Sequence, residues 1–453
     1  MKIQGHQQHR SDTLTILPEK RRPFSVKRIA LLSLTLGLTS LCLNAANLKQ
    51  VSVDNQGNVG DGSSKNPSIS ANGRFIVYHS TADNLVADDT NHASDIFYHD
   101  KKTGATYRIN LSSLGEGNDD SVDPRISDNG RYVVYSSAAT NLVEGDTNVK
   151  YDIFLFDSKK GATRRVSVGN SGEQSNGGSY IPAISANGRY VVYDSYASNL
   201  VSFDRNLSRD VFLYDKKTGK TSMISVNNEG KPGNADSSSA RISNNGRFVV
   251  FHSDALNLVA GDVNNASDIF LRDTQKGTTR LISANSSGEQ GNGGSYHAHI
   301  SNNGRYIVYA SDASNLVEGD NNNARDIFLY DAKKGTTRII SNSSAGIQGN
   351  NMSDNPRISS RGRYVVYASA AANLVEGDNN NFPDVFRFDK RTGLTVRVSV
   401  GQDGIEGTGG GSFSPDVSGN GRFVAYESYA DTLLTGDTNK NGDIFLKDLK
   451  KLP

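Results

Sequence analysis

A short motif of glycine, arginine and a run of apolar or aromatic residues recurs seven times along this chain of 453 residues. Its copies stand 57 to 59 residues apart, at Arg74, Arg131, Arg189, Arg247, Arg305, Arg363 and Arg422. A second motif, Asp-[Ile/Val]-Phe, keeps the same spacing and begins at Asp95, Asp152, Asp210, Asp268, Asp326, Asp384 and Asp443. Self-similarity at a fixed period indicates repeated units that bury their apolar faces against their neighbours. Residues 47–453 are therefore predicted to form one domain of seven units.

Each unit contains the pattern of four short strands. The first strand ends at a turn, commonly Asn-Gly as at Asn72-Gly73, and Asn-Gly tolerates the positive φ angles of a type I′ hairpin. The second strand, such as residues 131–135, is apolar at successive positions, which is typical of a strand buried on both faces. The third strand begins at the Asp-[Ile/Val]-Phe motif, and the fourth is a β-branched stretch such as residues 163–168.

The two ends of the repeat region indicate how the units are joined. The last unit stops soon after its third strand, and residues 48–53 match a fourth strand without the three that precede it. We therefore expect the N-terminal strand to complete the last blade, which closes a ring and removes an exposed sheet edge. An open solenoid would need distinct capping repeats instead. The sequence predicts an all-β fold, a single closed seven-bladed β-propeller with four-stranded antiparallel blades.

The repeat also resembles a known family. The pattern Pro-x-[Ile/Val]-Ser-x-x-Gly-Arg-[Tyr/Phe], followed by Asp-[Ile/Val]-Phe-x-x-Asp and Thr-x-Arg, is similar to the repeat of TolB-type β-propellers and covers essentially residues 47–453. It departs from that family in its turn, which has Asn or Arg rather than Asp before Gly. TolB itself has fewer blades and a separate N-terminal α/β domain, for which this chain has no room. The resemblance implies the fold and leaves the function open, since propellers host many activities.

Residues 1–46 have the layout of a secretory signal peptide. A basic run at residues 20–28 precedes an apolar stretch at residues 29–43 and the small residues Ala45 and Ala46, near which we expect cleavage. About 15 apolar residues are too few for a membrane span, which needs about 20. Arg21-Arg22-x-Phe24 resembles a twin-arginine motif, and the sequence leaves the export route open. The prediction is an exported protein, periplasmic or extracellular, without a membrane span after cleavage.

Charge and cysteine content exclude several classes of function. Residues 47–453 hold 42 basic and 46 acidic residues, and they lack the basic block of a nucleic-acid-binding protein. The single cysteine, Cys42, lies in the signal segment. Residues 47–453 can therefore form neither a disulfide nor a thiolate metal site. We expect a monomer that binds no nucleic acid.

An acidic loop, Asp-x-Asn-x-x-x-Asp, precedes each third strand. Ca²⁺ requires several oxygen ligands, and these residues could supply them on one side of a turning loop. The last copy, with Asn441 and Gly442, looks like the Asp-x-Asp-x-Asp-Gly type of calcium loop. The candidate ligands for Ca²⁺, the one cofactor that the sequence suggests, are Asp89, Asn91, Asp95, Asp146, Asn148, Asp152, Asp204, Asn206, Asp210, Asp262, Asn264, Asp268, Asp320, Asn322, Asp326, Asp378, Asn380, Asp384, Asp437, Asn439, Asn441 and Asp443. The alternative is structural, because Asp and Asn side chains also brace turns by bonding backbone amides.

Two further repeated side chains are expected to be structural. The arginine of the first motif is predicted to pair with the aspartate that opens the third strand, because guanidinium groups match carboxylates. The Asn of Asn-Leu-Val, as at Asn84, is expected to bond backbone groups.

The loops that lead into each first strand are rich in Gly, Asn and Ser and should lie at the mouth of the central channel, on the same face as the acidic loops. Binding residues are concentrated on such variable loops. The residues that differ among the copies there are the candidate ligand-binding residues Tyr180, Tyr296, His297, His299 and Phe413.

The sequence favours a non-catalytic binding or scaffolding module that holds a protein or a carbohydrate on its loop face. Neither a His-Glu-x-x-His motif nor a Gly-x-Ser-x-Gly elbow is present, so catalytic residues are not predicted. The alternative is a metal-dependent carbohydrate-active lyase or hydrolase with its site at the channel mouth. His297-Ala298-His299 would place two imidazoles on one side of an extended strand, and some propellers similar to this repeat are pectic-oligosaccharide lyases with His ligands and a divalent metal. Two solvated histidines are the other interpretation, and a cluster of His, Arg and Lys at the mouth would favour the enzyme.

Overall fold

The computed structural model describes residues 48–450 except residues 114, 403 and 438. The predicted signal peptide, residues 1–46, lies outside the described residues. The regular structure of the described part consists of thirty strands. No helix able to cross a membrane occurs within that part.

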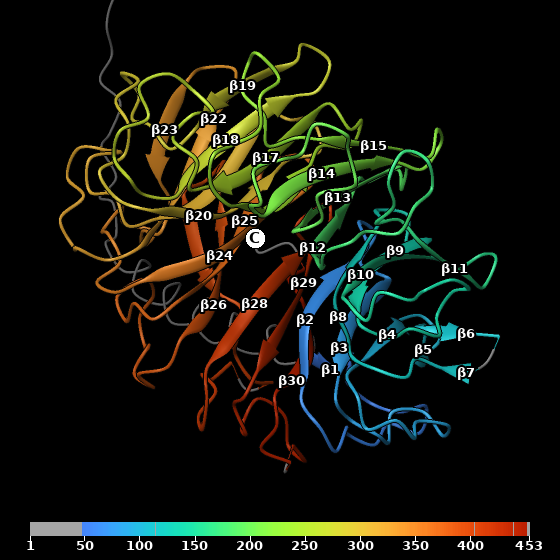
Figure 1. Cartoon of the computed structure of the whole chain (residues 1–453). Helices are drawn as coiled ribbons and strands as arrows, with labels where there is room; N and C mark the ends of the chain where they lie inside the picture. Colours follow the sequence, from blue (N-terminus) through green and yellow to red (C-terminus); the bar gives the residue numbers. More distant parts are fainter. Residues whose placement is uncertain (1–47, 114, 403, 438, 451–453) are drawn as a thin grey trace, which may run out of the picture. The chain divides into compact units, whose positions relative to one another are not determined.

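Seven four-stranded antiparallel sheets, here called blades 1 to 7, make up the domain (Figure 1). From the innermost strand outward, blade 1 contains β2 (Ser64–Ile69), β3 (Phe75–Ser80), β4 (Asp95–Asp100) and β5 (Ala105–Arg108), and blade 2 contains β8 (Ser121–Ile126), β9 (Tyr132–Ser137), β10 (Asp152–Asp157) and β11 (Ala162–Arg165). Blade 3 contains β12 (Ser179–Ile184), β13 (Tyr190–Ser195), β14 (Asp210–Asp215) and β15 (Lys220–Met223), and blade 4 contains β16 (Ser237–Ile242), β17 (Phe248–Ser253), β18 (Asp268–Asp273) and β19 (Thr278–Leu281). Blade 5 contains β20 (Ser295–Ile300), β21 (Tyr306–Ser311), β22 (Asp326–Asp331) and β23 (Thr336–Ile339), and blade 6 contains β24 (Ser353–Ile358), β25 (Tyr364–Ser369), β26 (Asp384–Asp389) and β27 (Leu394–Arg397). Blade 7 contains β28 (Ser412–Val417), β29 (Phe423–Ser428), β30 (Asp443–Asp448) and β1 (Leu48–Gln50), and a small hairpin of β6 (Leu111–Ser112) and β7 (Gly115–Glu116) follows blade 1.

The ring closes as the sequence predicts. β1 is the outermost strand of blade 7 and pairs with β30, from Leu48 opposite Lys447 to Gln50 opposite Phe445. Just beyond it, the Ser52 hydroxyl donates to Asp443 at 2.6 Å. Blades 7 and 1 are neighbours, and β28 in red lies beside β2 in blue (Figure 1). The prediction of a closed seven-bladed β-propeller is confirmed.

The core lies between successive blades, which explains the continuous apolar runs of the second strands. Val134 and Ile153 of blade 2, for example, share one buried cluster with Val191 and Phe212 of blade 3. Since each blade has a neighbour on both sides, both faces of its two middle strands are removed from water.

The turn after each first strand is not the predicted type I′ hairpin. In blade 1 the amide of Gly73 donates to the carbonyl of Ser70 at 2.8 Å, and Gly73 has a φ of 68° whereas Asn72 does not have a positive φ. This is a type I turn followed by a left-handed glycine. The side-chain oxygen of Asn72 instead accepts from the amide of Arg74 at 2.9 Å, so Asn braces the turn through its side chain.

The repeated arginine has a structural partner, but not the predicted one. Arg74 forms a two-pronged pair with Asp100, which ends β4, at 2.8 and 2.6 Å. The second strand runs antiparallel to the third, so the start of one lies beside the end of the other, and the aspartate that opens the third strand is out of reach. The same pair recurs as Arg131–Asp157, Arg189–Asp215, Arg247–Asp273, Arg305–Asp331, Arg363–Asp389 and Arg422–Asp448. The Asn of Asn-Leu-Val bonds backbone groups as predicted, with Asn84 accepting from the amide of Asp61 at 3.0 Å.

Each innermost strand contains a bulge at its third residue, which the sequence did not reveal. In β12, for example, the pairing register with β13 shifts between Tyr180 and Ala183, and Ile181 has a φ of 47°. A positive φ is strained for a β-branched residue. The corresponding residues of the other blades, also at positive φ, are Asn66, Asp123, Ser239, His297, Asn355 and Ser414. Because a bulge re-aims side chains, it decides which residues face the channel.

Candidate functional site

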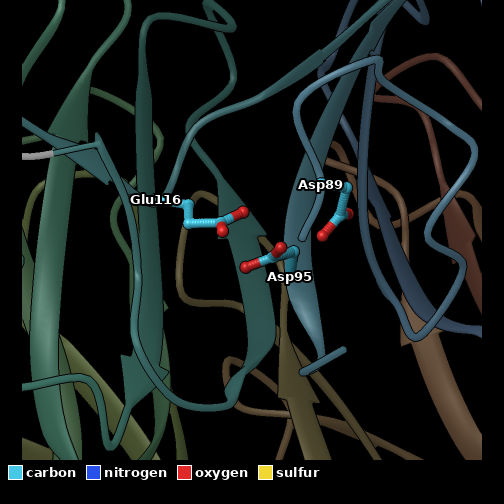
Figure 2. A group of neighbouring side chains, drawn as sticks. All are labelled: Asp89, Asp95 and Glu116. Atoms are coloured by element: carbon cyan, nitrogen blue, oxygen red, sulfur yellow. The ribbon is translucent and has the colours of Figure 1, made fainter. Parts of the chain in front are cut away.

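The acidic loop of blade 1 brings three carboxylates together. Figure 2 shows Asp89, Asp95 and Glu116 turned toward one another, with ligand atoms within 4.8 Å of each other. The Nη1 of Arg108 lies among them, at 2.9, 3.1 and 2.7 Å from the three groups respectively. Burial, together with the charge of Asp95, raises the pKa of Asp89 to about 7, although Arg108 opposes the rise. A guanidinium group therefore occupies the position that a cation would take.

Four other blades place an arginine, a glutamine or both at the same position. In blade 6, Arg397 contacts Asp378, Asp384 and Glu406 at 3.3, 3.3 and 2.6 Å. In blade 2, Arg165 lies 3.3 Å from Asp146, and Gln174 donates to Asp146 and Asp152 at 2.7 and 3.0 Å. In blades 4 and 5 a glutamine amide alone bridges the two aspartates, as Gln290 does between Asp262 and Asp268 at 2.7 and 2.8 Å and Gln348 does between Asp320 and Asp326 at 2.7 and 2.8 Å.

The asparagines of these loops brace the turns. Asn322, for example, accepts from the amide of Ala324 at 2.9 Å and donates to Asp326 and to the carbonyl of Gly349 at 2.8 Å each. Equivalent bonds are made by Asn91, Asn148, Asn206, Asn264 and Asn380. Asn439 accepts from the amide of Asn441, whose own side chain donates to the carbonyl of Asp61. This geometry matches the structural alternative set out for the acidic loops.

Within the described residues, no side chain bridges the two aspartates of the acidic pairs in blades 3 and 7, although in blade 7 Gln50 stands at the position of Arg108 and hydrogen-bonds Asp443. Met223 and Pro232 stand in blade 3 where blade 6 has Arg397 and Glu406. Burial raises the pKa of Asp210 to about 7 and that of Asp437 to about 6. The partners of these pairs are Asp204 and Asp443, and burial raises the pKa of both. In the part of the chain that the structure describes, these two pairs are thus the ones that neither an arginine nor a glutamine bridges.

The second concave region is the central channel. Two adjoining cavities of about 200 and 90 Å³ are walled by the innermost strands of the blades. The bulge residues line the larger cavity, and the fifth residues of the strands line the smaller one. These fifth residues are Ser68, Arg125, Ala183, Arg241, His299, Arg357 and Asp416. Arg125, Arg241 and Arg357, from the alternate blades 2, 4 and 6, line both cavities.

The channel is crossed at the end away from the acidic loops. The side-chain amide of Asn302 in blade 5 donates to Asp128 in blade 2 at 2.7 Å. Neighbouring blades are also linked there by backbone bonds, such as those from Ala71 to Asp128 and from Gly419 to Ala71, both at 3.0 Å. The cavities thus lie between this crossing and the face that carries the acidic loops.

Three predicted ligand-binding aromatic residues occupy the same position in alternate blades. Tyr180, Tyr296 and Phe413 are the second residues of β12, β20 and β28, so they lie in strands rather than in the preceding loops. Each follows a Gly-Gly-Ser segment. The ring of Tyr180 lies 5.5 Å from that of Tyr151 and 6.4 Å from that of Tyr196, and the ring of Phe413 lies 6.4 Å from that of Tyr429.

Arginines stack on two of these aromatic groups. The guanidinium carbon of Arg209 lies 5.4 Å from the centre of the Tyr180 ring, and that of Arg325 lies 4.7 Å from the centre of the Tyr296 ring. The structure thus places the predicted aromatic residues in separate clusters around the mouth.

The two predicted histidines do not form a pair on an extended strand. His297 is a bulge residue with a φ of 52°, lines the larger cavity and has its Nδ1 2.7 Å from Asp354. His299 lines the smaller cavity, where burial and then the nearby arginines lower its pKa well below the usual value. The premise of an extended strand is therefore wrong at His297.

Sequence reasoning missed the three channel arginines. They occupy the variable position of the Pro-x-[Ile/Val]-Ser motif, which also holds His299. A comparison of the seven copies at that single position would have shown three arginines in alternate repeats.

The fold and the channel define a seven-bladed β-propeller with an accessible central pocket. No protein-family model matches the chain, and no curated protein matches it in sequence. Among solved structures it is similar to an oligogalacturonate lyase in complex with manganese, at 12% identity and a TM-score of 0.55 over 90% of this chain and 95% of that one. It is also similar to the β-propeller domain of the trilobed protease from Pyrococcus furiosus, at 12% identity and a TM-score of 0.53 over 86% of this chain and 96% of that one.

TolB from Acinetobacter baumannii is also among the solved structures that match. It is 15% identical with a TM-score of 0.43, and the match covers 72% of this chain and 64% of TolB. The chain thus spans less than two thirds of that relative. At these identities the comparisons show the fold alone.

Proposed function

We propose that this protein is an exported, non-catalytic binding module that holds a protein or carbohydrate partner on the face around the channel mouth. One observation carries the proposal. The seven copies share the residues that hold each blade together, such as the Arg74–Asp100 pair, and these shared residues are here called the frame. The copies differ at the second residue of the innermost strand. That position holds Lys65, Val122, Tyr180, Ser238, Tyr296, Asp354 and Phe413. A symmetric frame with an asymmetric mouth is suited to recognising one partner.

The aromatic clusters supply the chemistry of recognition. Tyrosine combines a large apolar face with a polar end, and Tyr and Arg are enriched among the residues that dominate binding energies. Tyr196 is 51% exposed, and its ring lies beside that of Tyr180 at the channel mouth. Such rings can stack on sugar faces or on apolar side chains of a protein.

The test is binding of a panel of soluble oligosaccharides, measured by calorimetry, to the full chain and to Tyr180→Ala, Tyr296→Ala and Phe413→Ala. We expect at least one sugar to bind and each substitution near its site to weaken binding about 10-fold. Tyr107→Ala is the matched control, because Tyr107 is 53% exposed on the outermost strand β5. Equal losses in the control and the mouth variants would contradict a site at the mouth.

A metal-dependent carbohydrate-active lyase or hydrolase is the second candidate. The observation that favours it is the group of Arg125, Arg241, Arg357 and His299 in the channel, together with a fold like that of the manganese-bound lyase. It ranks second because, within the described residues, the two groups of three side chains close enough to share one ion are acidic loops without histidine. Incubation with oligogalacturonate and Mn²⁺ would test it, with the ultraviolet absorbance of an unsaturated product as the readout.

We also propose that Ca²⁺ stabilises the fold through the acidic pairs of blades 3 and 7. A ligand that binds only the folded state raises Tm with its concentration. Millimolar Ca²⁺ should raise Tm relative to EDTA, and the rise should be smaller in Asp437→Asn/Asp443→Asn. Asp320→Asn is the matched control, since Gln348 already bridges that pair. The same Tm in Ca²⁺ and EDTA would assign these loops to turn bracing alone.

A further inference from the structure

The channel gathers positive charge in a confined space. Arg125, Arg241 and Arg357 come from every second blade and line both cavities. Arg241 is only 8% exposed, and the other two are half-buried. Three guanidinium groups are thus held around one narrow pocket by a rigid ring of strands.

These groups lack the partners that arginine has elsewhere in the propeller. In the described part of the chain none of the three forms an ion pair. Each donates from Nη1 to the carbonyl oxygen of the residue before it, at 2.8, 2.8 and 3.0 Å for Arg125, Arg241 and Arg357. The Nε atoms of Arg125 and Arg241 are buried without a hydrogen-bond partner. Most of the fifteen or so N–H donors that three guanidinium groups carry are therefore unused by the protein.

The carboxylates nearby are engaged by other groups. Asp416 accepts from the amides of Ile69 and Val417 at 2.9 Å each. Asp123 accepts from the side chain of Asn66 at 2.9 Å. The carboxylate of Asp128 accepts from Asn302, and that of Glu427 accepts from the amide of Asn66. These acids moderate the field of the arginines, but they do not pair with them.

Burial and mutual repulsion make this arrangement unfavourable without an anion. Burial, followed by the charge of Arg125, lowers the pKa of Arg357 to about 10, and burial and then Arg357 and Arg125 lower that of Arg241 well below its usual value. An arginine remains protonated at neutral pH in any case. Groups left in so costly an arrangement are typical of a binding site.

We propose that the channel is a binding site for one small anion with two or more negatively charged oxygen groups, such as a polycarboxylate or phosphate. Guanidinium forks match the oxygen pairs of carboxylates and phosphates, and charge-assisted bonds of this kind are about twice as strong as neutral ones. The larger cavity of about 200 Å³ accommodates a compact molecule rather than a polymer. The ligand enters from the face that carries the acidic loops, because Asn302 and Asp128 cross the other end. This site lies inside the ring, and its assignment does not depend on a partner at the outer face.

The test is calorimetric titration of the full chain with sodium citrate, sodium phosphate and sodium acetate, with ionic strength held constant by NaCl. We expect saturable one-to-one binding of citrate, phosphate or both, and much weaker binding of acetate. Citrate binding alone would identify a polycarboxylate site, and phosphate binding alone a site for a tetrahedral anion. Equal binding of all three anions, or no saturable binding of any, would overturn the proposal.

Substitutions then locate the site. Arg125→Gln, Arg241→Gln and Arg357→Gln should each weaken binding about 10-fold or more, and the triple variant should lose it. The exposed Arg205 supplies the matched control, and Arg205→Gln should bind as the original chain does. Each variant is first checked by circular dichroism and by Tm without anion. A folded triple variant that binds with unchanged affinity would refute the assignment.

Discussion

Two groups of arginines in this propeller differ in their partners: those that pair with the aspartate ending the third strand, here called rim arginines, and those that line the channel. At the rim, Arg305 holds Asp331 in a two-pronged pair at 2.8 and 2.7 Å, and the pair recurs in every blade. In the channel, Arg241 donates to the backbone carbonyl of Ala240 and has no carboxylate partner among the described residues. Rim arginines neutralise charge within the fold, whereas channel arginines leave charge to be neutralised by something else. A repeated group is therefore explained by the frame, and an unrepeated group with unused donors indicates function.

The largest expected effect concerns the frame. Asp326 is fully buried and accepts from Ser341, Asn322 and Gln348. Asp326→Ala leaves these three donors unsatisfied, so the free energy of unfolding in EDTA should fall by about 3–5 kcal/mol. Urea denaturation measures the change. Glu318→Ala, at an exposed carboxylate, is the control and should unfold like the original chain. A loss below about 1 kcal/mol would show that the frame does not depend on these bonds.

A pH-dependent effect should be next in size. Burial lowers the pKa of His99 to about 4, from about 6.5 in the unfolded chain. The folded state therefore binds fewer protons, so this stabilisation is present above pH 6.5 and is lost as the pH falls toward 4. His99→Phe, which introduces the residue found at Phe156 and Phe388, should reduce the loss between pH 7 and 4 by about 2–3 kcal/mol. Tm measured as a function of pH checks this prediction.

A substitution in the channel should raise the stability of the protein rather than lower it. Arg241→Met removes a buried, repelled charge and keeps a long apolar side chain, so without anion the variant should be more stable by about 1–2 kcal/mol. Tm in a buffer of small monovalent anions is the measurement. A less stable variant would mean that Arg241 belongs to the frame, and the contrast between rim and channel would fail.

The smallest effect is expected at the rim. Arg305→Gln breaks the pair between the half-buried Arg305 and the buried Asp331, but Asp331 keeps the hydrogen bond from the amide of Lys333 at 3.1 Å. Ion pairs near the surface add little to stability. The Tm of this variant should change less than that of any other variant, and the difference should shrink further in high salt. A large loss of Tm would show that the seven rim pairs act together.

The frame could be predicted from the sequence because its two main motifs occur seven times. The spacing of Arg74 and Asp95 with their copies fixes the blade number, and the match of residues 48–53 to a fourth strand reveals the closure. The partner of Arg74 was mistaken because a motif shows which residues recur but not the register between two strands. Phe75 opposite Asp100 sets that register.

The candidate site could be predicted only in part. Tyr180, Tyr296 and His299 were identified because they vary among the copies, and they lie around the mouth and in the channel. Arg125, Arg241 and Arg357 share one position of the repeat, so the copies show that they recur in alternate blades, but the bulges that help to aim them into the channel leave no signal in the sequence. Nothing about Ile181 signals a bulge, since a β-branched residue is an unusual choice for a positive φ.

The closure of the ring also determines when folding can be completed during synthesis. Six blades are each built from one continuous stretch of chain, but blade 7 needs Leu48 to meet Lys447. Contacts so distant in sequence form slowly, because a long loop must be closed before they are gained. The chain leaves the ribosome with its N-terminus first, so β1 stays unpaired until β30 has been synthesised. A chain that stops before β30 cannot close its ring. The pairing of β1 with β30 therefore forms only after all seven blades have been translated.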